Sequence, residues 1–287
     1  MKSLLRYTGL GLLAYLIFLA ATLPATRAYP LLKERLAPLQ LYGVQGTLWS
    51  GRASDADLKA YRLGRLNWQL NPWALLLGRL EIAWTARKEN GTAQGRIART
   101  LTGKVRISDL TADIPVSELG GLVNLGQVRP DGVLRVKLSD VTMDGHLLVA
   151  AHGTLAWENA RVLTSQAVAL GNFILNLDTG AAGITGTLLD KGGPLKAQGV
   201  LTVKQQGSYQ FSGAFTPQPG TAQAPLTQAL DWLGAPGADG KISVSWSGML
   251  PGVSAAPAKS PLPNAPITQV QFPKDAIFRA ALADGNG

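Results

Sequence analysis

The side chains of this 287-residue sequence that could carry chemistry are few and widely spaced. Cysteine is absent, which excludes disulfides, thiolate metal sites and a cysteine nucleophile. His146 and His152 would share a face of one strand but lie about 20 Å apart along it, too far to bind one metal ion. Asp55 and Asp57 also share a strand face, but two carboxylates are too few for calcium, which takes roughly six to eight oxygen ligands.

Sequence motifs of familiar catalytic and nucleotide-binding sites are also missing. The chain has no EF-hand loop, Walker motif, HExxH or GxSxG, and no serine and aspartate are tied to a histidine in a triad pattern. The glycine spacing of GLVNLG, residues 121–126, lacks the strand, glycine-rich turn and helix that a phosphate site needs. We therefore predict a non-enzymatic protein with no catalytic residue, no metal ligand and no cofactor.

The charge of the chain is divided unevenly. Residues 1–106 carry 16 Lys and Arg against 5 Asp and Glu, or +11, whereas residues 107–287 carry 11 against 13, or −2. Such an asymmetry is compatible with a nucleic acid or an anionic membrane surface as partner. The basic residues stand singly in alternating strands, without the runs and aromatic platforms of a nucleic-acid site. We therefore expect no nucleic-acid partner, and a solvated basic face near a membrane.

An apolar stretch without charges runs from Tyr7 to Leu23. Extended back to Leu4 and interrupted only by Arg6, it reaches 20 residues, which as a helix span a hydrocarbon core of about 30 Å. Lys2 and Arg6 precede the stretch, so the positive-inside rule places the N-terminus in the cytoplasm and the rest of the chain outside. The stretch therefore predicts a transmembrane anchor.

A cleavable signal peptide is the alternative interpretation of the same stretch. Thr26 and Ala28 are small residues of the kind that precede a cleavage site, but Arg27 between them makes a poor one. The apolar stretch is also longer than most signal-peptide cores. We predict that the anchor is retained, and both alternatives place the bulk of the chain in the periplasm.

Alternation of apolar and polar residues dominates the chain after this stretch. It is seen in RLNWQL at 65–70, LEIAWT at 80–85, VLRVKLS at 133–139 and ISVSWS at 242–247. Clean alternation gives a sheet with one apolar and one polar face, and hence antiparallel pairing. We predict an all-β fold: an elongated, curved antiparallel β-sheet or a sandwich with a few short helices, preceded by one N-terminal transmembrane helix.

Short turns and helices separate the predicted strands. Turns are expected at Asp131-Gly132, Asp144-Gly145 and Gly192-Gly193, because these residues tolerate positive φ. In the first helix Asn71 caps, Pro72 takes the first position and Gly78 closes the last turn, and its apolar side is expected to cover an end of the sheet. The predicted helices, each beginning at a proline, are residues 72–77, 115–122 and 225–233.

The predicted domain organisation follows from these elements. Residues 1–28 form the cytoplasmic stub and transmembrane anchor, and residues 29–250 form a periplasmic all-β domain. Residues 251–287 are rich in proline, alanine and serine and lack any period, which predicts a flexible tail.

Two motifs with tryptophan follow the apolar stretch, GTLWSGRA at 46–53 and LNWQLNPWALLLGRL at 66–80. They resemble the type II secretion system protein N family, also called general secretion pathway protein N. In that family a Gly-x-x-Trp-x-Gly turn precedes a Trp-x-Leu-x-Pro step from strand to helix and a Gly-Arg-Leu, and the resemblance covers about residues 1–250. A glycine-flanked tryptophan at a strand end more often anchors a sheet edge than binds a ligand, so we predict structural roles. The matching residues are Gly46, Trp49, Gly51, Trp68, Leu70, Pro72, Gly78, Arg79 and Leu80.

This resemblance implies an accessory, non-catalytic subunit of the type II secretion system, the machine that carries folded proteins from the periplasm across the outer membrane. The chain would be a single-pass protein of the bacterial inner membrane, with its N-terminus in the cytoplasm and its bulk in the periplasm. Its β-domain would help to assemble or stabilise the apparatus through contacts with the secretin or the inner-membrane platform. Unpaired sheet edges would suit the addition of a partner strand.

A second resemblance supports an alternative function. The turn GGPLKAQG at 192–199 looks like those of AsmA-type envelope proteins, which are similar to long curved β-sheets with an apolar groove for lipid. That resemblance implies a lipid-binding or lipid-transfer module, with lipid as the partner. Closure of the apolar face by a second sheet or by the short helices would exclude lipid carriage, whereas an open face of hundreds of Å² would need something to fill it.

Overall fold

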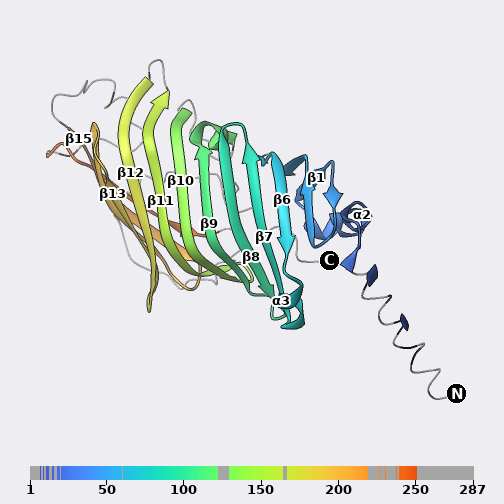
Figure 1. Cartoon of the computed structure of the whole chain (residues 1–287). Helices are drawn as coiled ribbons and strands as arrows, with labels where there is room; N and C mark the ends of the chain where they lie inside the picture. The colour runs from blue at the N-terminus through green and yellow to red at the C-terminus, as the bar shows by residue number, and fades with distance from the viewer. Residues whose placement is uncertain are drawn as a thin grey trace. The chain divides into compact units, whose positions relative to one another are not determined.

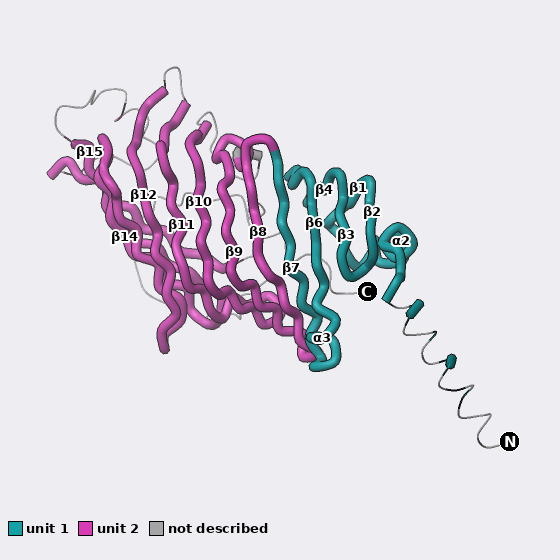
Figure 2. Tube along the Cα trace, in the orientation of Figure 1, with its two compact units in different colours: residues 1–88 teal, residues 89–287 magenta. Residues whose placement is uncertain are grey.

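The computed structural model describes residues 21–59, 61–121, 129–163, 167–218 and 239–250, together with residues 7, 9, 11, 12, 15, 18, 19, 226, 230 and 237. The chain divides into two compact units, Met1–Lys88 and Glu89–Gly287, which Figure 2 colours separately. Most described residues belong to antiparallel strands, so the predicted all-β class is confirmed. In this described part, no helix combines the length and the apolar character needed to cross a bilayer. The predicted tail, 251–287, and most of the predicted anchor lie outside the described residues.

Unit 1 begins with a helix and continues into short strands (Figure 1). Its elements are α2 (Ala25–Leu36), β1 (Leu39–Tyr42), β2 (Gln45–Gly46), β3 (Ser50–Ala53), β4 (Asp55–Leu58), β5 (Tyr61–Arg62), β6 (Arg65–Leu70), α3 (Pro72–Leu76) and β7 (Arg79–Lys88). The strands form antiparallel pairs in the order β1-β4-β5 and, separately, β7-β6-β3-β2. The predicted strand at 65–70 and the predicted helix beginning at Pro72 are therefore confirmed.

The register of β6 and β7 separates the two faces of this sheet. Trp68 lies directly opposite Trp84, so both rings share one face. Arg65 lies directly opposite Arg87 on the other face, and both arginines are exposed. The alternation read from the sequence thus produces an aromatic face and a basic face in unit 1.

Unit 2 is built on longer strands in consecutive antiparallel order from β8 to β16 (Figure 1). Its elements are β8 (Gly91–Thr100), β9 (Val105–Pro115), the 3₁₀ helix η1 (Val116–Gly121), β10 (Arg129–Asp144), β11 (Leu147–Leu163), β12 (Ala167–Gly180), β13 (Gly183–Asp190), β14 (Leu195–Val203), β15 (Ser208–Pro217) and β16 (Ile242–Met249). Each strand pairs with its neighbour in sequence, which is the simplest antiparallel topology.

Two of the predicted turns in unit 2 are confirmed and one is wrong. Asp144-Gly145 joins β10 to β11, and Gly192-Gly193 lies between β13 and β14. Asp131-Gly132 instead lies inside β10, where the register with β11 shifts. A β-bulge absorbs the extra residue and the strand continues. Gly132 takes φ +116° there, and a Cβ would lie 2.7 Å from the carbonyl oxygen of Glu158, so the glycine serves the bulge and not a turn.

The apolar face of the unit 2 sheet carries two clusters of buried residues. Leu226 and Leu230, the described residues of the predicted helix 225–233, are both helical and almost completely buried in the first cluster. Side chains from that segment therefore cover part of the apolar face. The first cluster contains Ala160, Val162, Val168, Leu170, Phe173, Leu195, Ala197, Leu226, Leu230, Ile242 and Val244. The second contains Val141, Ala151, Ile184 and Val203.

Candidate functional site

The first tryptophan motif forms a tight turn between β2 and β3. The backbone N–H of Thr47 donates to the carbonyl oxygen of Ser50 at 2.9 Å, and the N–H of Ser50 donates to Oγ1 of Thr47 at 3.1 Å. Gly46 has φ +89°, and a Cβ on it would lie 2.6 Å from the carbonyl oxygen of Ser50. Only glycine fits this position without displacing the backbone of the turn.

Gly51, the second glycine of the motif, lies beneath the ring of Trp68. The two residues are directly opposite on β3 and β6, and a Cβ at Gly51 would lie 2.3 Å from Cζ2 of the tryptophan. The indole Nε1–H of Trp68 donates to the carbonyl oxygen of Leu48 at 3.2 Å. The carbonyl oxygen of Trp49 accepts from the N–H of Leu70 at 2.7 Å, so the two motifs hold one another.

The second motif turns strand β6 into the short helix α3 and then into β7. Oδ1 of Asn71 accepts from the N–H of Trp73 at 3.1 Å, which caps the helix, and Pro72 occupies the first helical position. The N–H of Gly78 donates to the carbonyl oxygen of Leu75 at 2.9 Å, and Gly78 takes φ +69°. The cap, the proline and the closing glycine are therefore placed as the sequence predicts.

The apolar side chains of α3 do not cover an end of the sheet, which corrects the prediction from the sequence. The exposed fractions are 74% for Trp73, 78% for Leu76 and 71% for Leu77, whereas Ala74 is buried. The reason is length: a helix of five residues, tied to both strands by its capping bonds, turns only one small side chain inward. In the motif LNPWALLLGRL, apolar residues occupy every side of the helix. A helix that packs on a sheet has amphipathic spacing, so its absence here could have indicated that α3 leaves apolar side chains exposed.

The end of the predicted transmembrane stretch lies beside these motifs. The N–H of Leu48 donates to the carbonyl oxygen of Leu23 at 2.9 Å, and Pro24 forms an isolated bridge with Thr47. Leu23 and α3 are therefore at the same end of unit 1. We call this end the motif corner, defined as residues 23–24, 46–51 and 68–80. It contains all nine motif residues predicted from the sequence.

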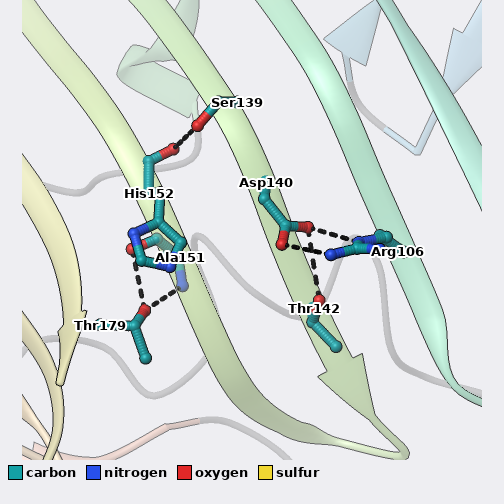
Figure 3. Close-up of polar contacts among 7 residues, drawn as sticks. All are labelled: Arg106, Ser139, Asp140, Thr142, Ala151, His152 and Thr179. Carbon is teal, nitrogen blue, oxygen red and sulfur yellow. Dashed lines mark hydrogen bonds and ion pairs between the residues drawn. The ribbon is translucent and has the colours of Figure 1, made fainter.

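The polar face of unit 2 carries a second group of candidate side chains (Figure 3). Nε and Nη2 of Arg106 donate to the two carboxylate oxygens of Asp140 at 2.9 and 2.8 Å. Asp140 is directly opposite His152, whose Nδ1 lies 2.8 Å from Oδ1 of Asp178. The Arg106 guanidinium holds the pKa of the Asp140 carboxyl below its ordinary value, against the opposing effect of burial. The Arg106–Asp140 ion pair and the His152–Asp178 hydrogen bond form a row of polar contacts across β9 to β12.

The structure separates the residues that could have formed a metal site. His146 lies in the turn between β10 and β11 and not on the strand with His152, which corrects the shared-strand assumption. Asp55 and Asp57 lie 3.6 and 3.7 Å from Nε of Arg62, so this cation already faces both carboxylates. Within the described ranges, no group of three or more histidine, aspartate or glutamate side chains could hold a metal ion.

Comparisons with known proteins agree on one family. The family model "Type II secretion system (T2SS), protein N" matches residues 37–245, which is more than half of the chain. The chain is 27% identical over 255 residues to the type II secretion system protein N of Aeromonas hydrophila, covering 87% of this chain and all of that protein. It is 25% identical over 252 residues to the protein N of Vibrio cholerae, covering 85% and 99%. No solved structure gives a significant match.

Proposed function

Since the chain belongs to the type II secretion system protein N family, we propose that it is an accessory, non-catalytic inner-membrane subunit of that system. In this proposal residues 7–23 anchor the chain, and the β-rich remainder lies in the periplasm and helps to assemble or stabilise the export apparatus. The family match over residues 37–245 is the observation that carries the proposal, and it makes the chain a component of the type II secretion system.

The edge of the unit 2 sheet offers a route to a partner subunit. Strand β16 is the last in the strand order, and within the described residues its strand partner is β15. An edge strand presents backbone N–H and C=O groups to which an extended segment of another protein can add. Ser243, Ser245 and Ser247 are exposed along this strand, so the face that they share carries small side chains.

Affinity isolation of the intact protein from gently solubilised membranes tests this function. Proteins and lipids in the eluate would be identified by mass spectrometry, and we expect the secretin or inner-membrane platform subunits. Ser245→Lys should reduce their recovery, because a charged side chain on an edge discourages strand addition. Thr187→Lys is the matched control, since Thr187 is exposed on the same face of the interior strand β13. Phospholipid without any secretion subunit would contradict the proposal and support the lipid-carrier alternative.

A further inference from the structure

The exposed side chains of α3 form an apolar projection at the motif corner. Trp73, Leu76 and Leu77 are each more than 70% exposed, and Leu75 and Leu80 beside them are 41% and 39% exposed. Apolar residues exposed singly are ordinary on a protein surface, but a contiguous group of large ones marks an interaction site. Figure 1 shows α3 at the tip of the hairpin between β6 and β7.

A second apolar surface begins at the same end of unit 1. The uncharged stretch ends at Leu23, whose carbonyl oxygen accepts a hydrogen bond from the N–H of Leu48 in the motif turn. The carbonyl oxygen of Trp49, the next residue of that turn, accepts from the N–H of Leu70, which shortly precedes α3. Among the described residues of the stretch, Phe18 and Leu19 are 65% and 49% exposed. Two hydrogen bonds thus connect the exposed stretch to the exposed helix through one rigid turn.

The charges at the motif corner favour a lipid bilayer over a second copy of the chain. Arg27 in α2 and Arg79 at the start of β7 are exposed, and neither has an acidic partner among the residues that the structure describes; Glu81, two residues further along β7, is half-buried. Residues 21–88 carry ten basic against four acidic side chains, or +6, so a second copy would place like charges together. Anionic headgroups would instead meet opposite charge.

The residue types at the corner match the layers of a membrane interface. Tryptophan is enriched where the headgroups meet the acyl chains, leucine is favourable just below, and a long arginine side chain extends back to the headgroups. We propose that α3 lies in the bilayer surface, with Trp73, Leu76 and Leu77 in the interface and Arg79 at the headgroups. The GTLWSG turn then sets the orientation of the unit 1 sheet at the membrane. This inference rests on the proposed anchorage of residues 7–23.

Single spin labels on the full chain test the proposal, because the chain has no cysteine of its own. Leu76→Cys places the label on α3, and Arg87→Cys places the control at the far end of β7, about 26 Å along the strand from Arg79. Both proteins would be reconstituted in vesicles of phosphatidylethanolamine and phosphatidylglycerol. Collisions of the label with oxygen, which concentrates in lipid, and with a water-soluble nickel chelate would then be measured.

We expect oxygen collisions to dominate at position 76 and nickel collisions at position 87. Equal exposure of both labels to nickel would overturn the proposal. A label at position 76 that neither reagent reaches in native membranes would mean that a protein covers α3, and would also overturn it. A third label, at Leu12→Cys, distinguishes failure of the α3 contact from failure of the proposed anchorage. A label in lipid at position 12 together with a label in water at position 76 would support the anchor and exclude the α3 contact.

Discussion

Units 1 and 2 bury different kinds of side chain although both are antiparallel sheets. Among the described residues, those buried in unit 1 are alanines apart from Leu66, whereas unit 2 buries large residues such as Ile184, Leu195 and Ile242 at 2% exposure. Unit 1 leaves several large apolar side chains at the surface, with Leu76 at 78%. Unit 2 is therefore held by a hydrophobic core, whereas unit 1 relies on backbone hydrogen bonds and on the close contact of Gly51 with Trp68.

This difference indicates how the two units divide their tasks. A core that is filled by its own residues needs no partner to be stable, and unit 2 can offer its edge strand to another protein. A unit whose large apolar residues point outward relies on an external surface to cover them.

The largest effect should come from emptying the core of unit 2. Leu195→Ala should lower the free energy of unfolding by about 2–5 kcal/mol, because the buried methyl groups leave a cavity. Leu76→Ala makes the same chemical change at an exposed site and should change it by no more than about 0.5 kcal/mol in detergent. Denaturant titrations followed by circular dichroism measure both. Equal losses would refute the contrast between the units.

A smaller loss is expected where unit 1 depends on close packing. Gly51→Ala places a Cβ 2.3 Å from the Trp68 ring and should destabilise the protein by about 1–3 kcal/mol. Gly180→Ala is the matched control, because a Cβ there meets nothing within 4 Å. Thermal unfolding followed by tryptophan fluorescence reports both changes. A stable Gly51→Ala protein would show that the glycine–tryptophan contact is dispensable.

The indole hydrogen bond of Trp68 should contribute less than this contact. Trp68→Phe removes the donor to the carbonyl oxygen of Leu48 and should destabilise unit 1 by about 1 kcal/mol, beyond the effect of a smaller ring. Trp73→Phe tests the same replacement at a ring that is 74% exposed and should be nearly neutral. Identical midpoints in denaturant titrations of the two variants would argue against a structural role for Trp68.

The ion pairs of unit 2 should give the smallest effect, which is present at neutral pH and disappears in acid. The pKa of Asp140 is lower in the folded protein than the ordinary value of about 3.9. Its contribution to stability is therefore complete above that value and is lost as the pH falls through the lowered folded pKa. Asp140→Asn and Arg106→Gln should both reduce the fall in unfolding free energy at acid pH, which we call the acid limb of the stability profile. Each should change stability at neutral pH by less than about 1 kcal/mol. An unchanged acid limb in both variants would exclude the pair as its source.

Alternation and glycine chemistry were sufficient to predict the class of the fold and the local shape of the motif corner. The strand at 65–70, the cap at Asn71 and the close of the helix at Gly78 all depend on neighbouring residues, which a sequence displays directly. The structural role of the motif residues stays a prediction, although the contacts of Gly51 and Trp68 support it.

The features that were predicted wrongly depend on how neighbouring elements pair and pack. Whether Gly132 makes a turn or a bulge is decided by the carbonyl groups of β11, which the local sequence does not show. The exposure of Leu76 depends on how little of α3 fits against its two strands. His146 falls in a turn because β10 and β11 pair up to Asp144 and Leu147, a register that alternation alone leaves open.

The division of tasks between the units is tested most directly by a photoreactive amino acid at position 76 or 245 of the full chain in native membranes. After irradiation, mass spectrometry would identify what each position contacts. We predict phospholipid adducts at position 76 in α3 and a secretin or platform subunit at position 245 in β16. A protein adduct at position 76 together with lipid alone at position 245 would contradict the account, because it would reverse the roles of the two units.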